Sequence, residues 1–167
     1  MSASYSAVFS GTSFAGVSVS AAQDLFSMLA SSSVPFIVTQ VKLAASGITS
    51  PSEIVIARKR LTSVVTQGSG GTVIAAANLA PVGQLDPNTP RNSTTTVHTN
   101  DTTRATTTGN TQIIDATTLQ LANGDNDIII PELWIDIPVS CAFILGLEVA
   151  PGSAVTLYGT VYYIEKF

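Results

Sequence analysis

The chain has 167 residues, a length that favours a single domain spanning residues 1–167. Hydrophobic residues make up 45% and charged residues only 11%, whereas ordinary globular domains carry about 25% charged residues. The net charge is −4 with only 7 Lys and Arg, which argues against binding to the phosphates of nucleic acids. The low charge indicates that partner proteins cover part of the surface, or that Ser and Thr keep it wet.

Val, Ile, Thr and Tyr are common and residues that favour long helices are few, which predicts an all-β chain. Strand-like segments are, in chain order, residues 4–10, 21–30, 36–45, 53–65, 72–77, 111–121, 128–138, 141–149 and 154–167. Residues 21–30 also fit a short helix, but we favour the strand. Turns or loops are predicted at residues 47–51 and 123–127, and a flexible turn at the Gly-rich residues 67–71.

The alternation of apolar and polar residues predicts which side chains share a face of a strand. In residues 36–45 the shared apolar face is expected to hold Ile37, Val41 and Leu43. In residues 141–149 it is expected to hold Cys141, Phe143, Leu145, Leu147 and Val149. The last strand carries Tyr on both faces, which is typical of a strand covered by a second sheet or by a partner.

Two segments could act as arms. Residues 1–14 are a possible N-terminal arm, and residues 78–110 form a long loop or arm that contains a Thr-rich tract. Residues 94–108 could be an exposed strand or an arm across a neighbouring subunit, because Thr suits extended backbone in water. Many strands without alternating helices predict a single-domain antiparallel β-sandwich or jelly roll.

Side chains suited to catalysis are few. His98, the single histidine, lies in the Thr-rich tract and is predicted to be solvated. Cys141, the single cysteine, is predicted to be buried and inert, which leaves no intramolecular disulfide and no His- or Cys-rich metal site. Asp125 and Asp127 faintly resemble the start of a calcium loop, but a polar turn fits better. We therefore expect no enzymatic activity, cofactor, metal or small-molecule substrate.

The remaining features concern surfaces and targeting. Residues 58–60 read Arg-Lys-Arg, for which a solvated face is favoured over a contact with an acidic partner. Trp134 has apolar neighbours and is predicted to lie in the core, although an exposed Trp could stack on a sugar. The N-terminus lacks the pattern of a signal peptide, and the apolar residues 128–149 are broken by prolines and acids, so no membrane span is expected.

Three segments together resemble small virion proteins of tailed bacteriophages, namely the capsid decoration, or cement, proteins. They are Ala21-Ala-Gln-Asp-Leu-Phe26, the Gly-Ser-Gly-Gly-Thr72 turn after a basic strand, and the terminal Val155-Thr-Leu-Tyr-Gly-Thr-Val-Tyr-Tyr163. The resemblance implies a jelly-roll homotrimer, made in the host cytoplasm, that binds the major capsid protein on the outer surface of the virion. The sequence departs from the usual pattern in its Thr-rich segment and in its scarcity of acids near Gly47, which leaves the docking role open.

Such a protein does no chemistry and stabilises the shell by binding across its subunits. Candidate interface residues are Tyr5, Phe9, Phe14, Arg58, Arg60, Tyr158, Tyr162 and Phe167. One alternative is a phage fibre or a receptor- or glycan-binding module, because jelly rolls also serve that purpose. A polysaccharide-degrading enzyme is a further alternative, supported only by scattered carboxylates.

Overall fold

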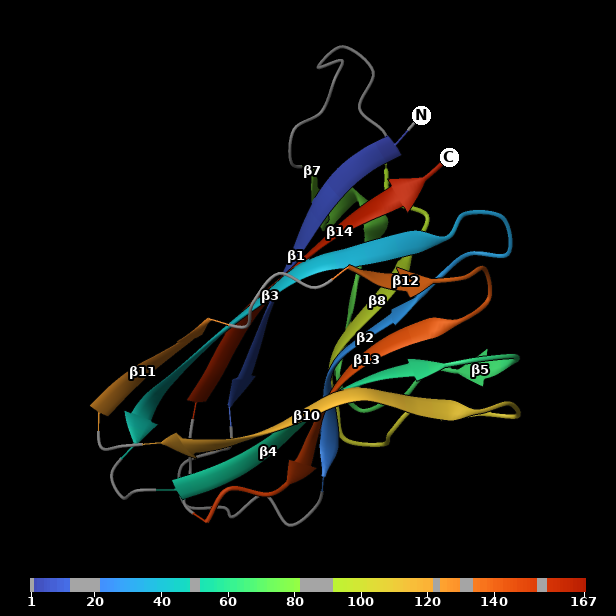
Figure 1. Ribbon diagram of the computed structural model, residues 1–167. Helices are drawn as coiled ribbons and strands as arrows, with labels where there is room; N and C mark the ends of the chain where they lie inside the picture. The colour runs from blue at the N-terminus through green and yellow to red at the C-terminus, as the bar shows by residue number, and fades with distance from the viewer. Residues whose placement is uncertain are drawn as a thin grey trace.

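The computed structural model describes residues 2–12, 22–48, 52–81, 92–121, 124–129, 134–152 and 156–167, with the backbone alone for 2–12, 47–48, 52, 80–81 and 124–129. These residues form two antiparallel sheets that pack face to face (Figure 1). The predicted all-β sandwich is therefore confirmed. Among the described residues, no helix is long and apolar enough to cross a membrane.

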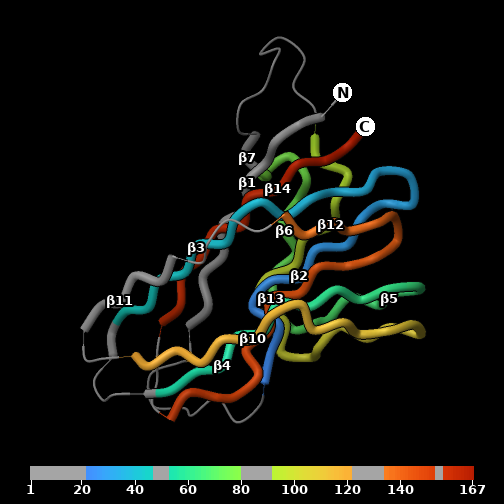
Figure 2. Tube along the Cα trace, in the orientation of Figure 1, coloured from blue at the N-terminus to red at the C-terminus, as the bar shows by residue number. Residues whose placement is uncertain are grey.

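The first sheet, called sheet I, has the strand order β11–β3–β14–β1–β7, and β12 also pairs with β3. Its strands are β1 (Ser2–Thr12), β3 (Phe36–Ile48), β7 (Ala80–Pro81), β11 (Gly124–Ile129), β12 (Ile135–Ile137) and β14 (Thr156–Lys166). The two ends of the chain lie side by side in this sheet, because β1 pairs with β14 from Ser2 opposite Lys166 to Thr12 opposite Thr156. Strand β14 also pairs with β3, and the tube in Figure 2 shows these two strands side by side.

The second sheet, sheet II, has the order β10–β4–β13–β2–β8–β6. Its strands are β2 (Gln23–Leu29), β4 (Ser52–Leu61), β6 (Thr72–Ile74), β8 (Thr96–Asp101), β10 (Thr111–Leu121) and β13 (Ala142–Val149). A two-stranded sheet of β5 (Val65–Thr66) and β9 (Thr106–Thr107) and one short 3-10 helix, η1 (Ala76–Asn78), complete the elements.

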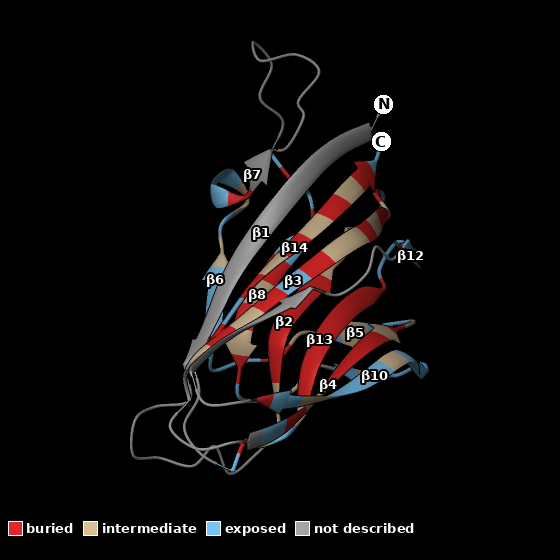
Figure 3. Ribbon diagram, turned by 60° about the vertical axis from the view of Figure 1, so that its left-hand side comes forward, coloured by how far each residue is buried: buried red, intermediate tan, exposed pale blue. Residues whose placement is uncertain are grey.

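The main core lies between the two sheets, and both contribute apolar side chains to it (Figure 3). Sheet I supplies Phe36, Val38, Val41, Leu43, Ala45, Ile135, Ile137, Leu157, Val161 and Tyr163. Sheet II supplies Leu25, Phe26, Met28, Ile54, Ile56, Val97, Leu121, Phe143, Leu145 and Leu147. Cys141 also joins this core at 7% exposure, as the sequence predicted.

A β-bulge changes one predicted face. The register of β3 against β14 shifts between Tyr162, opposite Gln40, and Tyr163, opposite Val38. The extra residue, Thr39, reverses the alternation, so Val38 rather than Ile37 joins the core. Val41 and Leu43 are buried as predicted, and the assignment of Ile37 to their face was wrong.

Neither described arm segment stands apart from the sandwich. Strand β1 is paired along its whole length with β14, so residues 2–12 are not a free arm, and Phe14 lies outside the described residues. Within the Thr-rich tract, β8 lies between β2 and β6, which favours the strand over the inter-subunit arm. Residues 124–127 belong to β11 rather than to a turn, and the predicted strand 53–65 ends earlier, at Leu61.

Candidate functional site

The outer face of sheet I carries aromatic side chains that the core does not use. Along β14, Leu157 and Tyr163 are buried, while Tyr158 is 47% exposed and Tyr162 is half-buried. The Lys42 ammonium lies 5.3 Å from the centre of the Tyr162 ring, a cation–π contact that orients both side chains. The predicted alternation of this strand is confirmed, and it places both candidate tyrosines on one accessible face.

Trp134 adds a third aromatic ring at the edge of this sheet. Ile135 and Ile137 are buried, so Asp136 faces outward, where its carboxylate binds the Lys166 ammonium at 2.9 Å. Trp134 is two residues before Asp136 and is 67% exposed. The prediction that Trp134 lies in the core was therefore wrong. We call Lys42, Trp134, Tyr158 and Tyr162 the aromatic face.

Phe167 and Arg60 lie on the surface as the interface prediction requires, but Arg60 is already engaged. Phe167 follows β14 and is 41% exposed. Arg60 is half-buried and donates from Nε to Gln112 at 2.8 Å and from Nη1 to the Asp136 carbonyl at 3.1 Å, which bridges the two sheets. The backbones of Tyr5 and Phe9 belong to β1, and their side chains are outside the described part.

The solvated face predicted for residues 58–60 was wrong at two positions. Arg58 is 5% exposed and forms an ion pair with Asp115 on the neighbouring strand β10. Burial lowers the pKa of Arg58 from its ordinary value. Lys59 is 9% exposed on the opposite face and binds Glu148 at 2.5 Å. Arg58 is therefore a structural residue and is unsuited to a surface contact.

A flap made of residues 62–71 and 102–110 covers the outer face of sheet II. Leu61, Ala142 and Ile144 form a second small core there, against which Val65 and Ala105 pack. Strands β5 and β9 pair within the flap, and Ser69 bridges Thr103. The flap is thus anchored to its own sheet by apolar contacts.

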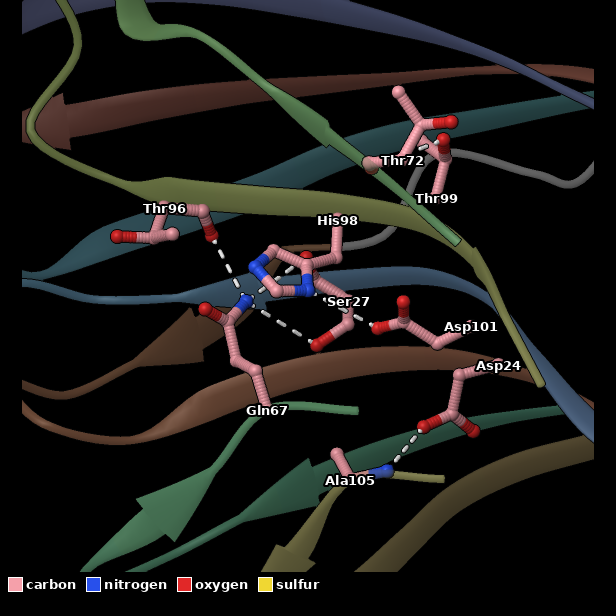
Figure 4. Close-up of polar contacts among 9 residues, drawn as sticks. All are labelled: Asp24, Ser27, Gln67, Thr72, Thr96, His98, Thr99, Asp101 and Ala105. Carbon is pink, nitrogen blue, oxygen red and sulfur yellow. Dashed lines mark hydrogen bonds and ion pairs between the residues drawn. The ribbon is translucent and has the colours of Figure 1, made fainter. Parts of the chain in front are cut away.

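Polar groups are enclosed between the flap and sheet II (Figure 4). The Gln67 amide donates to the Ser27 hydroxyl at 3.4 Å and to the Thr96 carbonyl at 3.2 Å. His98 Nδ1 lies 3.2 Å from Asp101 Oδ2, and its side chain is 17% exposed. The prediction of a solvated His98 was therefore wrong.

Two glycines of residues 67–71 lie close to neighbouring backbone. A Cβ on Gly68 would lie 2.2 Å from the Thr103 carbonyl oxygen, and one on Gly71 would lie 2.1 Å from that of Thr99. Both contacts are with backbone, so only glycine allows the two segments of the flap to pack this closely at Gly68 and the flap to approach β8 this closely at Gly71. The sequence indicated a flexible turn here, and it could not show which backbone atoms the glycines face.

Four charged residues form the network under the flap. Arg104 donates from Nη1 to Glu148 at 3.0 Å and lies 3.9 Å from Asp24, whose Oδ2 accepts the Ala105 N–H at 2.8 Å. Burial opposes ionisation of Glu148, but hydrogen bonds from Arg104 and Lys59 hold its pKa below the ordinary value. Burial raises the pKa of Asp24 against the opposing effects of the Ala105 N–H, Arg104 and Lys59.

The Asp24 shift gives an expected pH dependence for Asp24→Asn. Between the ordinary pKa of 3.8 and its raised folded pKa, the folded state binds a proton on Asp24 that the unfolded chain releases. Ionisation of Asp24 therefore lowers stability as pH rises through the folded pKa. Asn cannot ionise, and its oxygen can still accept the Ala105 N–H.

We expect the unfolding free energy of the wild type, minus that of the variant, to fall in urea titrations as the pH rises above the ordinary pKa of 3.8. The neighbouring charged groups are present in both proteins, so the difference isolates the change at Asp24. A difference that rises with pH would contradict the assignment.

A buried carboxyl group holds the start of the Thr-rich tract. Glu165 is 0% exposed and accepts hydrogen bonds from the hydroxyls of Ser93 and Thr95, both at 2.6 Å. The backbone N–H groups of Thr94 and Thr95 donate to the same carboxyl, each at 2.9 Å, and Tyr163 donates to the Ser93 hydroxyl. We call Glu165 and its donors in residues 93–95 the Glu165 cage. Nothing in the sequence indicated it, because Glu165 lies some 70 residues from these donors.

The geometry does not assemble the simplest nucleophilic arrangements. Cys141 lies in the core between the sheets, whereas His98 lies under the flap on the outer side of sheet II. Ser27 is 0% exposed beneath Gln67. Among the residues that the structure describes, no group of three or more His, Cys, Asp or Glu could hold a metal ion. The accessible candidate site is the aromatic face.

Searches of known protein families, of curated proteins and of solved structures found no match to this chain.

Proposed function

We propose that this chain is a non-enzymatic virion structural protein, a capsid decoration protein that binds the outer capsid surface as a homotrimer and stabilises the shell. The observation that carries the proposal is the aromatic face of sheet I. Tyr158 is 47% exposed and Trp134 is 67% exposed, whereas the opposite face of sheet I packs in the core. Tyr, Trp and a cation on a rigid surface are typical of protein interfaces.

The topology is compatible with this proposal and supports the jelly-roll assignment. Eight of the strands divide into the two four-stranded sets β11–β3–β14–β1 and β10–β4–β13–β2. From β1 to β4 the chain changes sheet at every step, as it does from β12 to β14. Eight-stranded double sheets of this kind include viral capsid domains, and they include lectins as well.

The low charge of the chain fits a surface that is partly covered in the assembly. In a trimer, each subunit presents one aromatic face to the shell. Once the first face binds, the second and third contacts become intramolecular, so modest individual contacts give high avidity. The proposal therefore needs no tight interface in any one subunit.

The test uses shells assembled from a major capsid protein encoded beside this chain. We expect the purified protein to be an oligomer, to bind undecorated shells and to raise their melting temperature. Tyr158→Ala is expected to weaken shell binding by about tenfold or more, because central aromatic residues dominate interface energies. Val64→Ala is the matched control, since Val64 is 68% exposed on the flap, and its binding should be unchanged. A monomer that leaves the melting temperature of the shells unaltered would sink the proposal.

The exposure of Trp134 favours a second candidate, a glycan-binding module of a fibre or receptor-binding protein. An exposed indole can stack on a sugar ring, and the same face offers the Lys42 ammonium as a polar group. Binding to a glycan array that is lost in Trp134→Ala, without any effect on shells, would favour this candidate over decoration.

A further inference from the structure

Strand β10 is one edge of sheet II. It pairs with β4 from Thr111 opposite Leu61 to Leu121 opposite Ser52, and no other described strand pairs with it. It spans 11 residues, whereas strands in globular proteins average about 5–6. The edge therefore presents a long row of backbone N–H and C=O groups away from β4.

The second half of this edge, from Ala116 to Leu121, lacks the protection that natural edge strands usually carry. Proteins commonly block pairing at an edge with Lys, with Pro, with a very short strand, with a β-bulge or with an inward-pointing charge. The irregularity of β10 and its inward charge, Asp115, both lie before this half. Strand β10 contains no Lys and no Pro, and its one charged residue, Asp115, is bound to Arg58 on the inner side. Residues 111–114 and 116–118 are all exposed, and Ile113 reaches 66%. The sequence keeps this edge open to a further strand.

We propose that β10 pairs with β10 of a second copy, antiparallel and around a two-fold axis at Thr118. The irregularity of β10 falls between Ile113 and Asp115, so the regular stretch runs from Asp115 to Leu121 and has Thr118 at its middle. A self-paired antiparallel strand places its axis at a residue that faces its own counterpart. Thr118 is exposed and is the central residue of the regular stretch.

The resulting register is free of conflict. Thr118 faces Thr118 of the second copy, a pair that can share a hydrogen bond across strands. Thr117 faces Leu119, Ala116 faces Gln120, and Asp115 faces Leu121 of the second copy. No like charges oppose each other, as they would if the axis lay at Asp115. An isologous contact of this kind needs a self-complementary surface, and β10 provides one.

This inference does not rest on the proposed function. A two-fold contact through β10 lies on sheet II, whereas the aromatic face lies on sheet I, so one chain can form both. If a three-fold contact is also present and its axis crosses the two-fold axis at a right angle, the assembly closes at six copies; without a three-fold contact, the two-fold contact gives a dimer. Either way, the number of copies is even.

Cysteine cross-linking tests the register on the full-length chain. In Thr118→Cys the two new thiols face each other, with opposed Cα atoms about 4.5–5.5 Å apart, inside the disulfide range of about 4.4–6.8 Å. The native Cys141 is buried and stays out of the reaction. We expect mild oxidation to give a covalent dimer.

Ala116→Cys is the matched control, because Ala116 is equally exposed on the same strand and on the same face. Its counterpart in the second copy is offset by four residues, or about 13 Å, which is too far for a disulfide. Cross-linking at Ala116 but not at Thr118, or at neither position, would overturn the proposal.

The mass in solution gives an independent readout. We expect the wild type to contain an even number of copies by light scattering, and Thr118→Lys to halve that mass, because two ammonium groups then meet at the axis. Val73→Lys should leave the mass unchanged, since Val73 is 60% exposed on β6, at the other edge of the same sheet. A matching melting temperature establishes that each variant is folded.

The failure of this inference can be told apart from the failure of the proposed function. A wild-type monomer or trimer overturns the β10 contact, and a trimer that binds shells leaves the decoration proposal intact. An even assembly that Thr118→Lys halves, but that ignores shells, supports the β10 contact and contradicts decoration. If β10 instead pairs with a strand of a shell protein, the purified wild-type chain will not self-associate. That result also overturns the proposal.

Discussion

Glu165→Ala is expected to lower the free energy of unfolding by about 3–5 kcal/mol, because each buried donor left without a partner costs about 1–3 kcal/mol. The Glu165 carboxyl is 0% exposed and accepts hydrogen bonds from two hydroxyls and two backbone N–H groups of residues 93–95. The two hydroxyls and the Thr95 N–H are buried, so bulk water reaches them only if the segment moves. We therefore expect amide exchange at Thr94 and Thr95 to accelerate more than exchange in the central strands.

Urea unfolding and hydrogen exchange measure the two effects separately. Glu165→Gln keeps one acceptor oxygen and should lose less stability than the alanine variant. Glu53→Ala is the matched control, because Glu53 is an exposed glutamate on a strand and accepts a hydrogen bond from the exposed Gln120 side chain at 2.6 Å. Its loss should stay within about 0.5 kcal/mol, as is usual for surface positions. Equal losses of unfolding free energy at Glu165 and Glu53 would show that the Glu165 cage does not stabilise the fold.

Local alternation could be read from the sequence wherever a strand is regular. Strand β14 alternates without interruption from Leu157 to Glu165, so the exposed side of Tyr158 was predictable. Strand β3 has the same kind of pattern, but the bulge at Thr39 reverses its faces. A bulge is set by pairing with a neighbouring strand, and periodicity within one strand cannot reveal it.

Buried charge was the main feature that the sequence could not place. Arg58 and Lys59 read as surface residues because they follow one another in a polar triplet. Their partners, Asp115 and Glu148, lie on β10 and β13, far along the chain. Only the strand order brings these carboxylates next to them, and burial without a partner would be prohibitive. Composition therefore fixes how many charges exist, and topology decides which of them are hidden.

The candidate surface was predictable in part. Tyr158 and Tyr162 were assigned to an interface because the resemblance implies one and the last strand is rich in aromatic residues, and their exposure fits that hypothesis. Trp134 was placed in the core because apolar residues flank it. In the structure the neighbouring isoleucine Ile135 turns inward and leaves the indole outside. His98 was misread because the flap covers it, and a covering segment leaves no mark on the sequence it covers.

Phe143→Ala is expected to lower the free energy of unfolding by about 3–5 kcal/mol, the usual cost of removing a buried aromatic ring. Phe143 is 0% exposed and lies on β13, between β4 and β2, where it packs in the core between the sheets. Removal of the ring loses its transfer free energy and leaves a cavity that the two hydrogen-bonded neighbours of β13 prevent from closing.

Val149→Ala on the same strand is the control, because the sequence pattern and the structure place the Val149 side chain differently. Alternation places Val149 on the face of Phe143, but the register of β13 shifts between Leu147 and Val149, and Val149 is 52% exposed. Its truncation should therefore cost no more than about 0.5 kcal/mol. Urea unfolding of both variants, with an unchanged m-value, gives the comparison. A loss at Val149 as large as that at Phe143 would mean that both side chains face the core and that the register shift is absent.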